Sequence, residues 1–446
     1  MSDTFTRSGA PLPLGVPVVA IRDGVPDGPF PAATPAPRGT GTPCLYANHS
    51  LNGRLPHPLP VGRWVLSWSS PIEHALRPDA VLTAGERLVA AREGVWELFD
   101  LEGNRIRHGA TESHRPVLDP VAGGLWTVAH SGILAAHDLA DGARRFVVHT
   151  RSGMDYHRVH LDADAERVLL TSIEVIDDIH EGGMSQHAFM ERVDLGADTA
   201  PDASGFLRSA TAGPHLVHQD DAAGTRPYES RVSGLLQSPQ GEPRMLAASW
   251  GDALHLATFD RLYVLDREMN VVAAFSDRFE PLALSVDERG RMHLVVRTAD
   301  GDAYWTVDRA GVRVVTAALP EGPSTFVAPP IVGHNHAVFL VSTRAIYALR
   351  SDVGLHWSFA ADDDIVGAVI TADELLLVTT RRGVYALNAR GEVGGLIAAP
   401  EGEDFCAPVV VTEHDTLVAA TEAHLLHYAI EALDERTFVG GGYIAT

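Results

Sequence analysis

The sequence predicts an all-β protein: a β-propeller of four-stranded blades, with eight blades expected and seven as the alternative. Three observations lead to this fold class. Short apolar runs bounded by Gly and acidic turns recur along the chain, as in strands joined by tight turns. Their spacing is close to that of propeller blades. The apolar content of 45% is enough for a core along most of the length.

The clearest repeat unit covers residues 364–391. It predicts a first strand at Ile365–Ile370, a second at Leu375–Thr380 and a third at Val384–Leu387. Arg381-Arg382-Gly383 forms the tight turn before the third strand, and Ala389-Arg390-Gly391 ends the unit.

Equivalent second strands open at regular intervals along the chain. The predicted first residues are Leu88, Leu125, Val168, Leu254, Met292, Val338, Leu375 and Leu417. Six of the seven gaps are 37 to 46 residues long, and the seventh is 86. Residues 196–243 are rich in Gly, Ala, Pro, Ser and Asp, so we interpret the long gap as an insertion after the third blade rather than a ninth unit.

The phrases GVYALNARGEV (383–393) and AIYALRSDVGLHWSFA (345–360) resemble repeats of the quinoprotein-like and WD40-like β-propellers. The resemblance covers roughly residues 65–430 and concerns the fold. Quinone-cofactor dehydrogenases of this class are exported and use a vicinal Cys pair and calcium ligands. The chain has two separated cysteines, Cys44 and Cys406, so we expect no PQQ.

The predicted organisation is a Pro/Gly-rich arm over residues 1–60 and a single propeller over residues 61–446. A propeller needs its first and last blades to join. We therefore expect a strand from Val61 to Trp68 to pair with the last unit, Pro408–Ile430. The segment Thr437–Ile444 is expected in the same region.

The composition of the chain excludes several kinds of partner and mechanism. The net charge of −23 argues against nucleic acid and anionic membranes as partners. All 35 basic residues are Arg, and a lysine-free chain cannot use a Schiff-base lysine. Two cysteines form no disulfide framework, so free thiols are expected. The N-terminus does not read as a signal peptide and no run reaches the length of a membrane span, which favours a cytoplasmic protein.

Histidines and acids gather where the innermost strands are expected to start, on the face of the channel that also receives the loops between second and third strands. His114 and His157 each precede an Arg, and His74 lies near the same face. With Glu242 they form a candidate site for a divalent metal such as Zn, Fe, Cu or Ni. The alternative is that such residues bond neighbouring blades and that arginines pair with the acids.

A long loop in the third blade, Asp177–His187, supplies the candidate catalytic residues. These are Asp178, His180 and Glu181, with Glu280 from a later blade. Together the patterns suggest a small-molecule enzyme of lyase, isomerase or cyclase type, with a His/carboxylate site at the channel mouth. The alternative is a non-catalytic propeller that serves as a protein–protein interaction platform.

Overall fold

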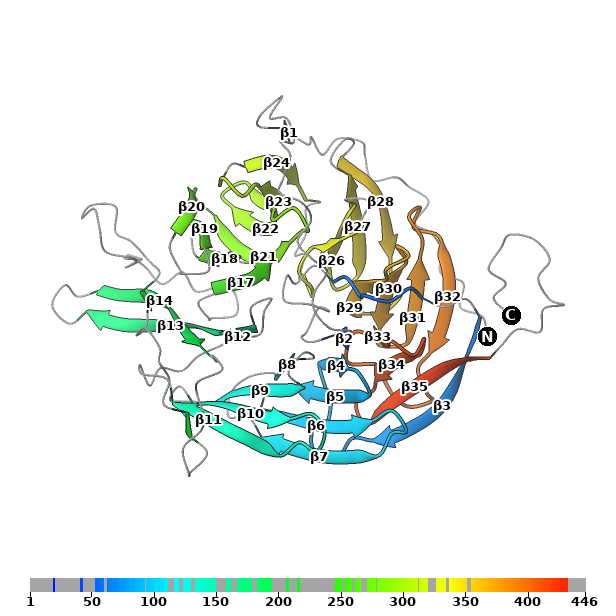
Figure 1. Ribbon diagram of the computed structural model, residues 1–446. Coiled ribbons are helices and arrows are strands. Elements are labelled where there is room, and N and C mark those ends of the chain that lie inside the picture. Colours follow the sequence, from blue (N-terminus) through cyan, green and yellow to red (C-terminus); the bar gives the residue numbers. More distant parts are fainter. Residues whose placement is uncertain are drawn as a thin grey trace.

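The computed structural model describes residues 19–20, 41–42, 53–59, 62–92, 94–110, 116–119, 123–129, 133–149, 158–161, 167–178, 183–194, 206–207, 215–216, 245–250, 253–258, 261–265, 271–277, 279–311, 313–319, 326–333, 337–350 and 354–431. Their strands form eight sheets that follow one another along the chain (Figure 1). Among the residues described, no helix has the length and hydropathy needed to span a bilayer.

Sheets one to four consist of the following strands. Sheet one has β4 (Ala80–Ala84), β5 (Arg87–Arg92), β6 (Val95–Asp100) and β7 (Arg105–Ala110). Sheet two has β8 (Val117–Asp119), β9 (Gly124–Ala129), β10 (Ile133–Asp138) and β11 (Arg144–His149). Sheet three has β12 (Arg158–Leu161), β13 (Arg167–Asp178), β14 (Gly183–Asp194) and β16 (His215–Leu216). Sheet four has β17 (Met245–Trp250), β18 (Ala253–Thr258), β19 (Arg261–Leu265) and β20 (Val271–Ser276).

Sheets five to eight repeat the pattern. Sheet five has β21 (Glu280–Val286), β22 (Met292–Thr298), β23 (Gly301–Val307) and β24 (Arg313–Ala318). Sheet six has β25 (Ile331–Val332), β26 (Val338–Val341), β27 (Ala345–Arg350) and β28 (Gly354–Ala360). Sheet seven has β29 (Ile365–Ile370), β30 (Leu376–Thr380), β31 (Gly383–Leu387) and β32 (Val393–Ala398). Sheet eight has β33 (Val410–Val411), β34 (Leu417–Ala420), β35 (His424–Glu431) and β3 (Arg63–Pro71). Three short strands extend sheets one, two and five: β2 (Gly41–Thr42), β15 (Phe206–Leu207) and β1 (Val19–Ala20).

The predicted fold class is confirmed. All eight positions predicted to open a second strand lie within one residue of the start of β5, β9, β13, β18, β22, β26, β30 and β34. The first strands of neighbouring sheets contact one another around the centre, including β4 with β8, β17 with β21, β25 with β29 and β33 with β4. The blade count stays a prediction, because the third sheet and the segment 196–243 are described only in part.

Ring closure follows the predicted route. β3, from the N-terminal side, pairs antiparallel with β35, from the C-terminal side, and the register runs from Arg63 opposite Glu431 to Pro71 opposite His424. The last sheet therefore combines three strands from the end of the chain with one from its beginning. This arrangement covers an edge that would otherwise expose unpaired backbone groups. The segment Thr437–Ile444 lies outside the described residues.

Apolar side chains fill the spaces between consecutive sheets. Phe99 of sheet one packs with Val410 and Leu425 of sheet eight, while Leu98 packs on the other side with Leu118 of sheet two. Similar clusters join sheets four to five, five to six, six to seven and seven to eight. Each fully buried side chain of this size contributes about 1.5–3 kcal/mol. In the described part of the chain, the core thus lies at the interfaces between consecutive sheets.

Two tryptophans latch an outer strand onto the next sheet. Trp357 of β28 donates from Nε1 to the carbonyl of Ala389 at 2.9 Å, and its ring covers Gly391. Trp68 of β3 repeats this with the carbonyl of Leu101 at 2.8 Å and with Gly103. Both glycines have positive φ. A Cβ added at either one would stand 2.9 Å or less from a ring atom of the tryptophan that covers it.

The residues between the first and second strands form a recurring turn. In sheets five, seven and eight, this turn is closed by a backbone hydrogen bond. The N–H of Asp287, Thr371 or Thr412 donates to the carbonyl four residues later. The residue in positive φ is Gly290 in sheet five, but Glu374 in sheet seven and Asp415 in sheet eight. A non-glycine residue there is uncommon.

Part of the predicted N-terminal arm packs on the propeller. Arg54 bridges to Ile370, and Leu55 is 2% exposed in the cluster between sheets seven and eight. The carbonyl of His57 accepts from the N–H of Ala372, and the N–H of Leu59 donates to Asp373. Residues 53–59 therefore cross the ends of several first strands.

The prediction of a long loop at Asp177–His187 is wrong in its extent. β13 continues to Asp178 and β14 begins at Gly183, so only residues 179–182 lie between the two strands. The register pairs Glu174 with His187 and Asp178 with Gly183. The loop is shorter than predicted because backbone pairing continues through these polar residues. Two 12-residue strands form a long ribbon (Figure 1).

Candidate functional site

We call the face where first strands begin, and where the hairpins between second and third strands emerge, the channel face. Glu280 opens β21 on this face and stands opposite Arg297 of β22. Nη1 of Arg297 lies 3.9 Å from Oε2 of Glu280, and its Nε donates to Asp302 at 3.0 Å. The candidate catalytic acid Glu280 is therefore one member of an ion-pair group.

Asp364 connects two sheets on the channel face. Nε of Arg344, from the β26–β27 hairpin of sheet six, lies 2.7 Å from Oδ1 of Asp364. Nη2 of Arg381, from the β30–β31 hairpin of sheet seven, lies 3.5 Å from Oδ2. Arg382 reaches the neighbouring Asp363 at 4.0 Å. These pairs are the arrangement given above as the alternative to a metal-binding ring.

The same pattern continues at the junction of sheets eight and one. Nη2 of Arg77 lies 2.9 Å from Oε1 of Glu422. Glu403 lies 2.8 Å from Nδ1 of His424 and accepts from the hydroxyl of Thr421. Burial alone would raise the pKa of Glu403, but the bonds from Thr421 and His424 outweigh it and lower that pKa.

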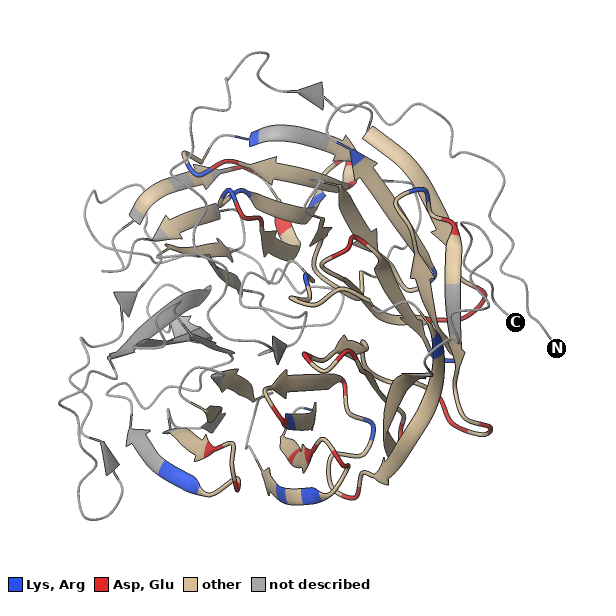
Figure 2. Ribbon diagram, turned by 45° about the vertical axis from the view of Figure 1, so that its right-hand side comes forward, with Lys and Arg blue, Asp and Glu red and all other residues tan. Residues whose placement is uncertain are grey.

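We call the set Arg77, Arg297, Arg344, Arg381 and Arg382 with their acids the ion-paired rim. Such exposed pairs contribute roughly 0–1 kcal/mol each to stability. (Figure 2 shows how Arg and acidic residues are distributed along the strands and turns.)

His74 lies on the crossover between β3 and β4, beside the outermost strand of sheet one. Its ring stacks on His108 of β7, with centroids 3.6 Å apart and planes at 18°. The buried carboxylate of Glu97 accepts from the backbone N–H groups of His74 and Ala75 at 2.5 and 2.7 Å. Arg105 lies 3.5 Å from Glu97 and 2.7 Å from Glu73. His74 is thus held over an outer strand.

The other predicted site residues fall largely outside what the structure describes. His114, His157 and Glu242 of the metal set, and His180 and Glu181 of the catalytic set, lie outside the described residues. Asp178 ends β13 opposite Gly183. In the described part of the chain, no group of three His, Cys, Asp or Glu side chains is arranged to hold a metal. The metal and catalytic roles remain predictions.

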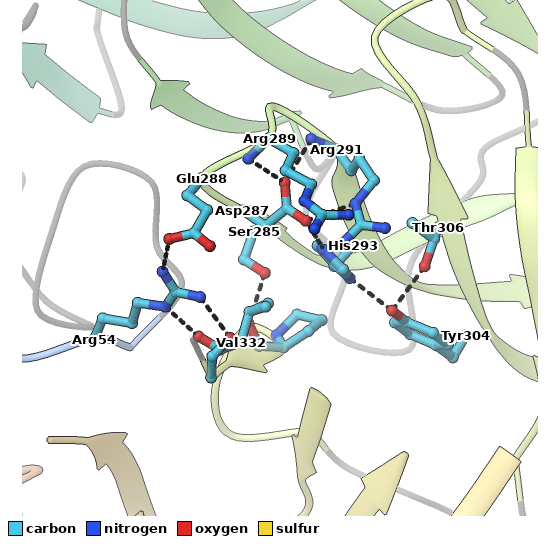
Figure 3. Close-up of polar contacts among 12 residues, drawn as sticks. Arg54, Ser285, Asp287, Glu288, Arg289, Arg291, His293, Tyr304, Thr306 and Val332 are labelled. Carbon is cyan, nitrogen blue, oxygen red and sulfur yellow. Dashed lines mark hydrogen bonds and ion pairs between the residues drawn. The ribbon is translucent and has the colours of Figure 1, made fainter. Parts of the chain in front are cut away.

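A buried polar network that the sequence did not indicate lies at the opposite end of sheet five (Figure 3). Oδ1 of Asp287 accepts from the backbone N–H groups of Arg289 and Arg291, both at 2.9 Å, and Oδ2 accepts from Nε of Arg291 at 2.7 Å. Nδ1 of His293 shares a 2.6 Å hydrogen bond with the Tyr304 hydroxyl, which in turn bonds Thr306 at 2.8 Å. The sequence feature that could have pointed to it is the Asp-x-x-Gly turn at 287–290.

Burial sets the protonation of this network. Burial alone would raise the pKa of Asp287, but the contacts with His293 and Arg291 hold it far below its usual value, so the group is a carboxylate. Burial lowers the pKa of His293 more than Asp287 raises it. Its Nε2 stands 3.2 Å from Asp287 without hydrogen-bond alignment. Asp287, His293, Tyr304 and Thr306 are all under 5% exposed, which makes the network structural.

Arg54 ties the N-terminal segment to this end of the ring (Figure 3). Its guanidinium donates to the carbonyls of Val332 and Gly333 in sheet six and to Glu288 in sheet five at 2.9 Å. The hydroxyl of Ser285 donates to the carbonyl of Pro330 at 2.6 Å. Sheets five and six and residues 53–59 are therefore joined by polar contacts, on the side away from the channel face.

Comparison with known proteins identifies the fold. A search of protein-family models and of curated protein sequences finds no match. Among solved structures, BamB from Moraxella catarrhalis is 13% identical with a TM-score of 0.52, covering 84% of this chain and 99% of BamB. The quinohemoprotein alcohol dehydrogenase ADHIIG from Pseudomonas putida HK5 is 11% identical with a TM-score of 0.56, covering 89% of this chain and 80% of that one. At these identities the likeness concerns the fold alone. The chain therefore has the quinoprotein-like β-propeller fold that its repeats resemble.

Proposed function

We propose that this protein is a non-catalytic propeller that binds another protein on its channel face. The observation that carries the proposal is the ion-paired rim. Asp364 and Glu280, which could otherwise serve as ligands or bases, each lie beside arginine side chains of neighbouring hairpins. At Asp364 both carboxylate oxygens already lie beside a guanidinium.

The walls of the channel support the same function. All five residues of β4 are buried, and Ala, Val and Leu make up four of them. Ile331 and Val332 of β25 and Val410 and Val411 of β33 are likewise buried. A catalytic channel needs convergent polar groups in an accessible cavity. Apolar, closely packed first strands are better suited to a rigid scaffold.

The rim has the chemistry of a protein-docking surface. The side chains of Arg77, Arg344, Arg381 and Arg382 are 55–79% exposed, and Leu76 beside them is 47% exposed. Arginine is enriched at protein interfaces, where its planar group can pair and stack. We therefore expect a partner that presents carboxylates or aromatic rings to these arginines.

The test begins with proximity labelling by the tagged protein in its native cells, followed by reconstitution of the complex from purified components. The double variant Arg381→Gln/Arg382→Gln should bind the purified partner at least about tenfold more weakly. Arg390→Gln, an exposed arginine in the turn after β31 on the opposite side, is the matched control and should bind within about twofold of wild type. Raising salt from about 50 to 500 mM should weaken wild-type binding.

The proposal is overturned if no purified partner binds, or if the rim and control variants lose affinity equally. It is also overturned if the wild-type protein turns over a small molecule and loses that activity in a His114→Ala or His157→Ala variant. Equal unfolding midpoints for all variants in urea would show that affinity changes do not come from misfolding.

A further inference from the structure

Four arginines lie on the outermost strands of sheets one and two. Arg105 and Arg107 belong to β7, and Arg144 and Arg145 open β11. All four are exposed, and neither strand contains an acidic residue. Figure 1 shows β7 and β11 on the outer side of neighbouring sheets, and Figure 2 shows arginine on both. We call these four residues the basic edge; it shares no residue with the ion-paired rim.

Two of these arginines carry charges that no acid in the described part of the chain neutralises. Arg105 and Arg145 each pair with a carboxylate, at 2.7 and 2.9 Å. Among the described residues, no hydrogen bond or ion pair holds the guanidinium of Arg107 or of Arg144. The chain has a net charge of −23, so acids are plentiful, yet these two guanidinium groups remain available to a carboxylate from outside.

Arg107 and Arg144 lie near one another although they come from different sheets. The aliphatic stem of Arg107 covers Gly142 in the turn before β11, where an added Cβ would stand 2.6 Å from Cδ of the arginine. The stem thus takes the place that tryptophan rings take in the two latches described above. Burial lowers the pKa of His137 of β10, and the nearby charges of Arg144 and Arg107 lower it further. Packing therefore holds the stem of Arg107 while its charged end meets solvent.

β7 is also the edge of its sheet. One side of β7 pairs with β6, and the other side has no strand partner in the described part of the chain. No side chain of β7 is buried. The outer edges of two other sheets each take a strand from a distant part of the chain, since β15 pairs with β11 and β1 pairs with β24. The same kind of edge is open on sheet one.

We infer that the basic edge binds an extended acidic segment of a partner protein, which adds a strand to β7 and places carboxylates on Arg107 and Arg144. Backbone hydrogen bonds along an open edge supply affinity, and side chains supply specificity. A second copy of this chain fits poorly, because pairing β7 with β7 brings the arginines of both copies together. A nucleic acid fits poorly as well, since it needs a broad basic face and this chain is strongly acidic.

The test is isothermal titration of the full chain with a synthetic peptide of alternating Glu and Thr. We expect saturable binding, at least about tenfold tighter than that of two control peptides. In the first control Gln replaces Glu, which removes the charge. In the second Pro replaces Thr, which keeps the charge but prevents pairing as a strand. Amide hydrogen exchange of the complex should show added protection in β7 and none in β32, an outer strand without arginine.

Two variants test the arginines. Arg144→Gln should weaken peptide binding at least about fivefold, and Arg107→Gln/Arg144→Gln at least about tenfold. The single variant leaves the stem of Arg107 on Gly142, so its effect does not come from lost packing. Arg390→Gln, at an exposed arginine of sheet seven, is the matched control and should bind the peptide like the wild-type protein.

The inference is overturned by the absence of saturable binding up to about 1 mM peptide, by equal binding of either control peptide, or by added protection that omits β7. Equal losses in Arg144→Gln and Arg390→Gln, or displacement of the peptide by single-stranded DNA, would also overturn it. Failure here leaves the protein-docking proposal for the channel face intact, because Arg381→Gln/Arg382→Gln should not change binding of this peptide.

Discussion

A disulfide across the closure of the ring would measure how strongly β3 holds the propeller together. Val65 and Ala429 stand opposite each other on β3 and β35, and both are partly buried. Opposed antiparallel residues have the Cα separation that a disulfide needs. We therefore expect Val65→Cys/Ala429→Cys, in a background without the native cysteines, to form an intramolecular disulfide.

The magnitude follows from the length of chain that the bond closes. The two positions are 364 residues apart in sequence, for which the chain-entropy relation gives an upper value of about 6 kcal/mol at 25 °C. The matched control is Val95→Cys/Ala110→Cys, an opposed pair on β6 and β7 only 15 residues apart, with an upper value of about 3 kcal/mol. Engineered disulfides usually give less than this, so the ordering of the two variants is the prediction.

The assay is urea unfolding of oxidised and reduced protein, with thiol counts and non-reducing electrophoresis to establish which bonds form. The closure disulfide should raise the free energy of unfolding more than the control does. Free thiols or cross-links between molecules, with the control disulfide formed normally, would refute the pairing of β3 with β35. Equal stabilisation by the two disulfides would refute the view that closure joins distant ends of the chain.

Three further predictions follow from burial and topology. Removing residues 1–30 should barely move the melting temperature, whereas removing residues 1–69 takes away most of β3 and should cause aggregation in size-exclusion chromatography; identical melting would place closure elsewhere. Burial lowers the pKa of His255 from 6.5 to about 4, and the unfolded chain then binds the proton more readily. The free energy of unfolding should therefore fall by about 3 kcal/mol as pH drops from 6.5 to 4, and His255→Leu should lack this part of the fall in urea titrations at each pH; an unchanged slope would contradict the assignment. Burial raises the pKa of Cys406 to about 12, so this thiol should react slowly in native protein at pH 7, while denatured protein shows two free thiols; a count near zero would indicate a disulfide.

The second and third strands could be predicted from sequence because they are buried on both faces. Leu88 and Leu417 open such strands, and the β31 residues Val384 to Leu387 form one apolar run. Outer strands are harder to recognise because one side meets water. In β7 no side chain is buried, and β32 is interrupted by two glycines, so neither has a clear apolar pattern. The Trp68 and Trp357 latches depend on carbonyls 33 and 32 residues away, which periodicity does not reveal.

The candidate site was harder to predict because its chemistry depends on partners from other hairpins. Glu280 could be predicted from its position before a first strand, but sequence could not show that Arg344, from another sheet, would lie 2.7 Å from Asp364. His74 was expected near the channel face because it precedes a first strand. In the structure, its ring stacks on His108 of β7, the outermost strand of sheet one. The network around Asp287 was missed because its members come from a turn and two strands.

We propose that the channel face is an ion-paired docking surface rather than a metal centre. The most direct test is elemental analysis of the purified protein, beside the variant His114→Ala/His157→Ala and a sample stripped by chelator. We expect well under one transition-metal ion per chain in the wild-type protein, with no change in the variant. About one zinc, iron, copper or nickel ion per chain, lost in the folded variant, would contradict it and establish the metal site that the two histidines suggested.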